Sequence, residues 1–99
     1  MGFFSNIFKT TSNEELRQML ANGALLLDVR TKGEFAGGHA KGAKNIPLDV
    51  LRANLSKLDK SKPIIAVCAS GMRSGSAVSL LKQNGFTEVY NGGSWTKYM

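Results

Sequence analysis

The sequence predicts an α/β fold in which a small parallel sheet is covered by helices on both faces. Two apolar runs, Ala24–Val29 and Pro63–Val67, are short and nearly unbroken, as in strands that are buried on both sides. Segments with helical spacing of apolar residues alternate with these runs, and such alternation is typical of parallel α/β sheets. Ligands of such sheets bind at the carboxyl ends of the strands, where Asp28 and Cys68 stand.

The amino-terminal part of the chain predicts a helix with a short segment ahead of it. Ser12-Asn13-Glu14-Glu15 is a capping box, with a hydroxyl at the N-cap and a glutamate three residues later, so a helix begins there. Asn22-Gly23 ends the helix, because glycine is common just beyond the carboxyl end of a helix. Residues 1–10 are expected to be a lead-in to a single domain that spans residues 11–99.

Further helices and extended segments follow in alternation. A helical turn is expected over Lys32–Phe35, and an extended segment over Lys44–Pro47, because the residue before a proline avoids the α region. A second amphipathic helix is predicted from four leucines at helical spacing, namely Leu48, Leu51, Leu55 and Leu58. The last helix starts at Ser74 or just before it and ends at Asn84-Gly85, and a final short strand is predicted over Glu88–Tyr90.

Composition restricts the classes of function. Among the 99 residues, 13 Lys and Arg against 7 Asp and Glu give a formal charge of +6, which favours anionic partners. The basic residues are dispersed and do not alternate with aromatic residues, so nucleic-acid binding is not expected. No apolar stretch approaches the roughly 20 residues of a membrane span, so membrane association is not expected either. The single cysteine cannot form an internal disulfide, which suits a reducing compartment and predicts a cytoplasmic location.

Cys68 stands where reactive chemistry is expected. It ends an apolar strand and is followed by the glycine-bearing turn Ala69-Ser70-Gly71-Met72-Arg73 and then by a helical pattern. At such a joint the N–H groups of the turn and the positive end of the helix dipole favour the thiolate, which is the nucleophilic form of cysteine. A cysteine that is only a small buried apolar residue would not need this glycine-bearing turn behind it.

Short motifs from about Thr11 to Trp95 follow one another in a specific order. They are Leu27-Asp28-Val29-Arg30, Glu34-Phe35, Gly38-His39, Gly42-Ala43, Asn45-Ile46-Pro47, Cys68 to Ser74, Gly85-Phe86, and Gly92-Gly93 with Trp95. In order and spacing the set resembles the single-domain rhodaneses, which are thiosulfate-type sulfurtransferases. The resemblance implies a rhodanese-like α/β fold and a Cys68 that takes up a sulfane sulfur as a persulfide and passes it on. Trp95 arrives one or two residues earlier than in the family, so a short terminal helix is expected.

The resemblance also implies roles for the residues around Cys68. The substrate would be bound by a ring of N–H groups from Ala69 through Arg73, by hydroxyls and by the charge of Arg73; the residues concerned are Ala69, Ser70, Gly71, Met72, Arg73 and Ser74. Ser74 has an alternative interpretation as the N-cap of the helix. Asp28, Arg30, Glu34 and His39 are expected to be scaffold near the site, with Arg30 paired to Glu34. No cofactor is implied, and one cysteine with one histidine cannot make a closed metal site.

The expected partners are a small anionic sulfur donor such as thiosulfate and an external acceptor, because no second cysteine is present to resolve a persulfide. Cyanide, a glutathione-like thiol or a thioredoxin-like protein would serve as acceptor. One alternative is a rhodanese-like sulfur-carrier or protein-interaction module with little turnover of its own. A cysteine-based phosphatase or arsenate reductase is less favoured, because those enzymes place one more residue between cysteine and arginine than the four between Cys68 and Arg73.

Overall fold

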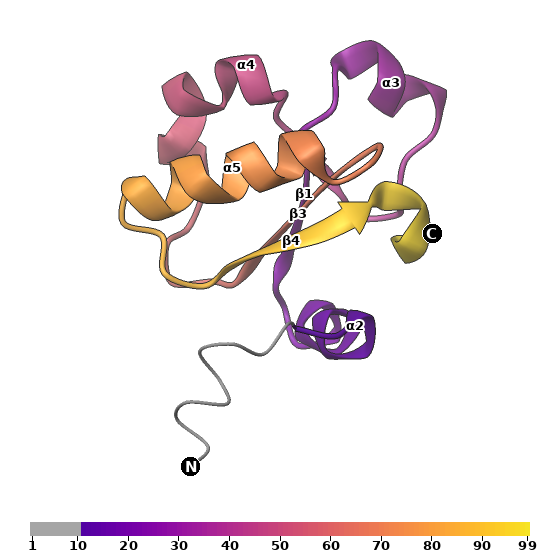
Figure 1. The fold of residues 1–99 in the computed structure, drawn as a ribbon, viewed down its shortest axis with the longest axis horizontal. Coiled ribbons are helices and arrows are strands. Elements are labelled where there is room, and N and C mark those ends of the chain that lie inside the picture. The colour runs from indigo at the N-terminus through magenta and orange to yellow at the C-terminus, as the bar shows by residue number, and fades with distance from the viewer. Residues whose placement is uncertain (1–10) are drawn as a thin grey trace.

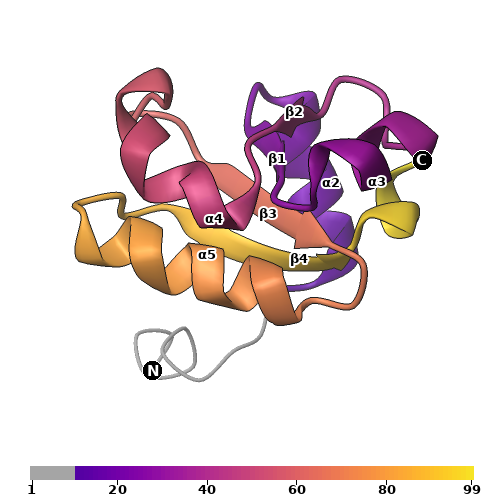
Figure 2. The ribbon, with the colours of Figure 1, turned by 90° about the horizontal axis from the view of Figure 1, so that it is seen from above.

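The computed structural model describes residues 11–99 and contains a four-stranded, all-parallel sheet with the strand order β2-β1-β3-β4 (Figure 2). The strands are β1 (Leu25–Asp28), β2 (Lys44–Asn45), β3 (Ile64–Cys68) and β4 (Val89–Ser94). The predicted α/β class with a small parallel sheet is confirmed. The lead-in that was expected over residues 1–10 lies outside the described residues.

Helices lie on both faces of the sheet, as predicted. α4 and α5 cover one face and α2 covers the other (Figure 1). The α-helices are α2 (Asn13–Ala21), α3 (Lys32–Gly37), α4 (Leu48–Leu51) and α5 (Met72–Gln83), and the 3₁₀ helices are η1 (Arg52–Lys57) and η2 (Trp95–Tyr98). Within residues 11–99, none of the helices has the length and apolar character needed to cross a bilayer.

The side chains of β3 alternate between two apolar clusters, one on each face of the sheet. Ile64, Ala66 and Cys68 belong to the cluster beneath α4 and α5, whereas Ile65 and Val67 belong to the cluster beside α2. This alternation follows from the two-residue period of a strand. It places Cys68 on the same face of the sheet as α5, at the carboxyl end of an inner strand.

The predicted capping box at the start of α2 is confirmed. The Ser12 hydroxyl accepts a hydrogen bond from the Glu15 N–H at 3.1 Å, and Glu15 Oε1 accepts one from the Ser12 N–H at 2.9 Å. The same arrangement joins Thr31 to Glu34 at the start of α3, where the sequence reads Thr-x-x-Glu again. These reciprocal bonds satisfy backbone N–H groups that the first helical turn leaves without partners.

The second amphipathic helix does not form as one continuous element. α4 ends at Leu51, and the 3₁₀ segment η1 that follows contains a non-helical residue, Asn54, with φ −119° and ψ 18°. The side-chain amide of Asn54 donates to the Val50 carbonyl at 2.7 Å, which is the carbonyl that the Asn54 backbone N–H would bind in a regular α-helix. The four predicted leucines still pack against the core, which is why their spacing resembles that of a helix.

The last strand is longer than predicted. β4 extends through Gly92 to Ser94, whereas the sequence pattern predicted a strand over Glu88–Tyr90. Its pairing with β3 changes register, because Asn91 lies opposite Ala66 while Gly93 lies opposite Val67, leaving Gly92 as the extra residue of a bulge. The terminal helix is short, as expected, and consists of the single 3₁₀ segment η2.

Gly92→Ala is expected to lower the free energy of unfolding by about 1–3 kcal/mol, because overpacking forces buried neighbours apart. A Cβ at Gly92 would lie 2.8 Å from Ile65 Cγ2, 2.9 Å from Val67 Cγ1 and 2.9 Å from the Tyr98 hydroxyl. The matched control is Gly33→Ala in α3, where a Cβ meets nothing within 4 Å and stability is expected to rise slightly. Urea unfolding of both variants measures the difference, and equal stability of the two would contradict the packing argument.

Candidate active site

Cys68 is the last residue of β3 and lies close to the start of α5. The connecting turn spans residues 69–71, and α5 begins at Met72. Gly71 is the N-cap, with a left-handed φ of 102° that favours glycine, so this turn depends on the residue type that the sequence provides. Cys68 is fully buried beneath the turn. The positive end of the dipole of a 12-residue helix therefore lies next to the only sulfhydryl group of the chain.

Three hydrogen bonds surround the sulfur of Cys68. The Gly71 N–H donates to Sγ at 3.0 Å, the Ser74 N–H donates to it at 3.4 Å, and the Ser74 hydroxyl lies 3.4 Å away. A ring of N–H groups from Ala69 through Arg73 was expected. Of these, the structure brings the N–H groups of Gly71 and, with a smaller effect, Ser70 to the sulfur, together with that of Ser74, one residue beyond the expected ring. Such converging donors form a small anion-binding concavity.

The interpretation of Ser74 as a helix N-cap is wrong. Gly71 occupies the cap, and Ser74 is the third residue of α5, where it is fully buried. Its hydroxyl donates to Asn91 Oδ1 at 2.6 Å on one side and faces Cys68 Sγ on the other. Ser74 is thus part of the sulfur environment through both its N–H and its hydroxyl.

The pKa of the Cys68 thiol is set by opposing effects. Burial raises the pKa, but the hydroxyl and N–H of Ser74, together with the N–H groups of Gly71 and Ser70, lower it more strongly, to about 7. Hydrogen bonds to the charged form of an acid favour ionisation. A substantial fraction of thiolate is therefore present near neutral pH, which is the condition for nucleophilic sulfur chemistry.

Alkylation of Cys68 by iodoacetamide is expected to rise with pH around a midpoint of about 7 in the native protein. Because the folded pKa is lowered, reactivity is present above this midpoint and is lost as the pH falls through it. The same chain unfolded in urea is the control, and its midpoint is expected near the ordinary value of about 8.5. Coincident native and unfolded profiles would contradict the described environment of the sulfur.

Arg73 forms a bidentate ion pair with Glu34 across the site entrance. Its two terminal nitrogens lie 2.7 and 3.0 Å from the two carboxylate oxygens of Glu34, and both side chains are about one-third exposed. Hydrogen bonding to Arg73, and then to the Thr31 N–H, lowers the pKa of Glu34 to about 2, and the pair raises the pKa of Arg73. The pair ties α3 to the first turn of α5 over the usable pH range.

The expected pairing of Arg30 with Glu34 is wrong. Arg30 turns inward to the fully buried Asp28, with Nη2 at 2.7 Å from Oδ2 and Nε at 3.0 Å from Oδ1. It also donates to the Gly38 carbonyl at 2.7 Å and lies over the ring of Trp95, 4.3 Å from the ring centroid. Since Arg30 reaches only the backbone carbonyl of Glu34, at 3.4 Å, the carboxylate of Glu34 remains available to Arg73.

His39 is not among the residues whose hydrogen bonds reach the sulfur. Its ring stacks on Phe35, with centroids 3.7 Å apart, and its Nδ1 lies 2.7 Å from the Phe35 carbonyl. These local contacts fix the turn after α3. Met72 is 81% exposed, so it contributes to the surface around the site.

Asn91 was not identified from the sequence, although Asn91 bonds to Gly71 in the active loop, by which we mean the turn over residues 69–71 after Cys68. It lies on β4, next to β3 in the sheet, and bonds to both Gly71 and Ser74. One signal was present, because Asn91 is a polar residue near the carboxyl end of a strand, as Asp28 and Cys68 are. The sequence did not reveal this position, because the predicted strand stopped at residue 90, before the bulge at Gly92.

Grooves flank the active loop on two sides. One, of about 580 Å³, is bordered by Ser70, Met72 and Lys97 among others. The other, of about 240 Å³, is bordered by Val29 and Arg73 among others. The first groove is lined by residues of the turn after Cys68, and the second reaches Arg73 in the first turn of α5.

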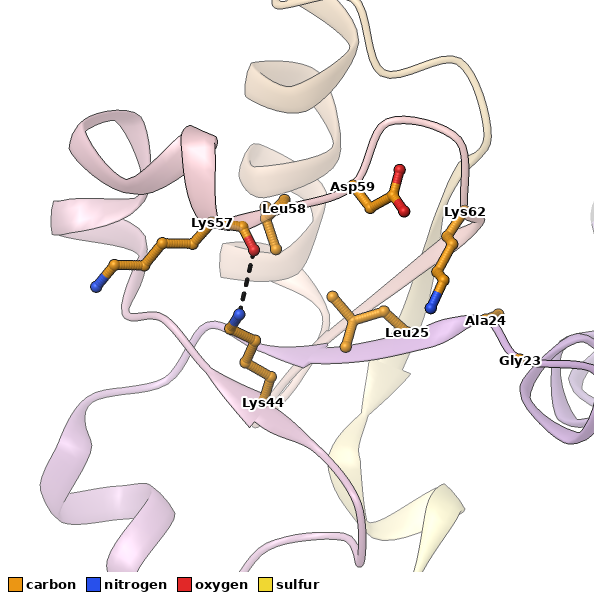
Figure 3. A pocket seen from close by; sticks show the side chains of 8 residues that line it. All are labelled: Gly23, Ala24, Leu25, Lys44, Lys57, Leu58, Asp59 and Lys62. Carbon is orange, nitrogen blue, oxygen red and sulfur yellow. Dashed lines mark hydrogen bonds between the residues drawn. The ribbon is translucent and has the colours of Figure 1, made fainter.

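A separate basic pocket of about 230 Å³ lies where β1 and β2 begin (Figure 3). Lys44, Lys57 and Lys62 line it together with Asp59, and Lys44 Nζ donates to the Lys57 carbonyl at 3.2 Å. The amino ends of parallel strands lie at the sheet edge opposite to Cys68, so this pocket does not belong to the sulfur site.

Over residues 11–99, no three His, Cys, Asp or Glu side chains are grouped so that they could hold a metal ion. The arrangement at Cys68 instead consists of an acidic thiol and hydrogen-bond donors that stabilise negative charge on sulfur. Such an arrangement has the features that nucleophilic chemistry at a thiolate requires.

Comparison with known proteins agrees with this geometry. The family model for the rhodanese-like domain matches residues 12–99. The chain is 44% identical to YqhL of Bacillus subtilis over 85 residues, covering 86% of this chain and 67% of that protein, and 33% identical to the thiosulfate sulfurtransferase GlpE of Pseudomonas aeruginosa, covering 88% and 79%. It also matches the structure of the human single-domain sulfurtransferase TSTD1, with a TM-score of 0.74, 32% identity, and coverage of 90% and 93%. The chain therefore belongs to the family of rhodanese-like domains.

Proposed function

We propose that this protein is a sulfurtransferase that moves a sulfane sulfur from a small anionic donor such as thiosulfate to a thiophilic acceptor through a persulfide on Cys68. The observation that carries the proposal is the buried thiol at the start of α5, which accepts hydrogen bonds from two backbone N–H groups. The Ser74 hydroxyl, together with these N–H groups and that of Ser70, lowers the pKa of the thiol to about 7, so the nucleophile exists at neutral pH.

The first step is attack of the Cys68 thiolate on the outer sulfur of thiosulfate. A bond forms between Sγ and that sulfur, the sulfur–sulfur bond of the donor breaks, and sulfite leaves with the electron pair. The product on the protein is a persulfide anion, whose charge the Gly71 and Ser74 N–H groups stabilise. Because Cys68 is fully buried, the loop over residues 69–73 must move aside for the donor to reach it.

The second step regenerates the thiolate. A nucleophile such as cyanide or a thiolate attacks the outer sulfur of the persulfide, takes that sulfur, and leaves the electron pair of the broken bond on Sγ. Two grooves border residues that follow Cys68, and either offers room for a small donor or for part of an acceptor. The positive charge of the chain favours anionic donors, and we assign the acceptor to a thiol or a thioredoxin-like protein of a reducing, cytoplasmic compartment.

Arg73 is proposed to meet the anionic donor at the site entrance. Its guanidinium is engaged by Glu34, so donor binding would share or replace that carboxylate. Ser70 and Met72 would line the approach as loop residues, with Asp28, Arg30, Glu34 and His39 as the scaffold.

Steady-state formation of thiocyanate from thiosulfate and cyanide tests the proposal. The protein is expected to turn over repeatedly, at a rate that falls as the pH drops below about 7. Uptake of one sulfur atom without turnover would instead identify a sulfur carrier. The proposal would be overturned if neither thiosulfate nor a persulfide donor gave any uptake or turnover.

A further inference from the structure

We propose that Asn91 is a positioning residue for the sulfur chemistry, because its side-chain amide holds the two residues whose N–H groups donate to Cys68 Sγ. This inference rests on the proposed function. Asn91 does not bond to the sulfur itself in the described hydrogen bonds; it acts through the loop and through α5.

Each residue that donates its N–H to Cys68 Sγ also bonds to the Asn91 amide. Gly71 donates its N–H to Sγ at 3.0 Å, and its carbonyl accepts from Asn91 Nδ2 at 2.9 Å. Ser74 donates its N–H to Sγ at 3.4 Å, and its hydroxyl donates to Asn91 Oδ1 at 2.6 Å. A single amide on a neighbouring strand thus bridges both donors of the sulfur site.

The orientation of the Asn91 amide is itself fixed. Oδ1 accepts a second bond, from the Gly93 N–H at 3.0 Å, so a flipped amide would set its NH₂ group against a backbone donor. Asn91 lies opposite Ala66 in the pairing of β4 with β3. The amide is therefore carried by a strand that is paired with β3, and not by the loop that it holds.

The loop needs such an external support. Residues 69–71 connect a strand to a helix, and Gly71 has neither a side chain nor a common φ to restrain it, with φ at 102°. The Gly71 carbonyl is bound from one side by the Gly75 N–H of α5 at 3.0 Å and from the other by Asn91. Loss of the Asn91 bond leaves the Gly71 carbonyl held by the Gly75 N–H alone, which weakens the restraint on the turn that aims the Gly71 N–H at the sulfur.

The bond from Asn91 to the Gly71 carbonyl persists when the thiol ionises. In the thiol state the one proton of the Ser74 hydroxyl goes to Asn91 Oδ1, and its lone pairs face the S–H. In the thiolate state the hydroxyl turns that proton toward Sγ and gives up its bond to Asn91 Oδ1, while Oδ1 keeps the Gly93 N–H and Nδ2 keeps the Gly71 carbonyl. Asn91 therefore keeps hydrogen-bond partners in both protonation states of Cys68.

The test is the pH profile of iodoacetamide alkylation, which reads the single thiol directly. Asn91→Ala is expected to raise the pKa of Cys68 by about one unit, which slows alkylation about tenfold at about pH 6 and leaves the rate well above the raised pKa unchanged. Asn91→Asp, nearly the same size, keeps the acceptor but loses the donor to Gly71 and adds negative charge, so a shift at least as large is expected. The matched control is Asn84→Ala, which removes a similar bond, to the Leu80 carbonyl at 2.8 Å, at the far end of the same helix.

A folded Asn91→Ala with the wild-type profile would overturn the inference, and so would an equal shift in Asn84→Ala. If Asn91→Ala does not fold, Asn91→Gln decides in the same way, because it stays uncharged but moves the amide by one methylene group. Alkylation requires no sulfur donor, so this result does not depend on whether the wild-type protein turns over thiosulfate. Where it does, kcat at about pH 6 is expected to fall in Asn91→Ala with little change in the donor KM.

Discussion

Asp28→Ala is expected to lower the free energy of unfolding by about 3–5 kcal/mol, because breaking a buried ion pair leaves one charge without its partner. Asp28 is fully buried, and it accepts from both the backbone and the guanidinium of Arg30. Arg30 in turn connects β1 to the Gly38 carbonyl and to Trp95. Without Asp28 to hold it, Arg30 would no longer be fixed in place, and this would loosen the turn after α3 together with the carboxyl-terminal segment.

Chemical unfolding monitored by the fluorescence of Trp95 measures the loss. Asp59→Ala is the control, since Asp59 is exposed and bonds only locally to Ser61, so its removal is expected to change stability little. A loss in Asp28→Ala no larger than that in the control would show that the buried pair is not a determinant of the fold.

Cys68→Ser is expected to reduce sulfurtransferase turnover by about a thousandfold or more, because no other residue of the chain can form the persulfide. Serine is similar in size and keeps the donors of Gly71 and Ser74, so the variant should fold. Ser76→Ala is the matched control in the same helix, where the exposed hydroxyl contacts the Met72 carbonyl at 3.5 Å and faces no substrate. Residual turnover in Cys68→Ser within tenfold of the control would remove Cys68 from the mechanism.

The sequence was sufficient to predict the parts of the fold that depend on local chemistry. The apolar runs that end at Asp28 and Cys68 form inner strands, and the capping box at Ser12 starts a helix. Their signals are contained in a few consecutive residues. The position of Cys68 at a strand end, ahead of a glycine turn, was accessible for the same reason.

The errors concern features that are decided by tertiary partners. Arg30 had two acids within reach of its sequence position, and only the fold shows that it takes Asp28 and leaves Glu34 to Arg73, which is 39 residues away. Asn91 could not be linked to the loop, because that contact requires the register of β4 against β3. Spacing alone cannot reveal which side chains a neighbouring strand brings to a site.

The most direct measurement of the central claim is the intact mass of the reduced protein after exposure to excess thiosulfate and desalting, with Cys68→Ser treated in parallel. The account predicts a gain of about one sulfur atom on the wild type only, which cyanide or a thiol removes. An unchanged wild-type mass after thiosulfate and after a persulfide donor, in protein whose Cys68 still alkylates with a midpoint of about pH 7, would contradict a persulfide mechanism.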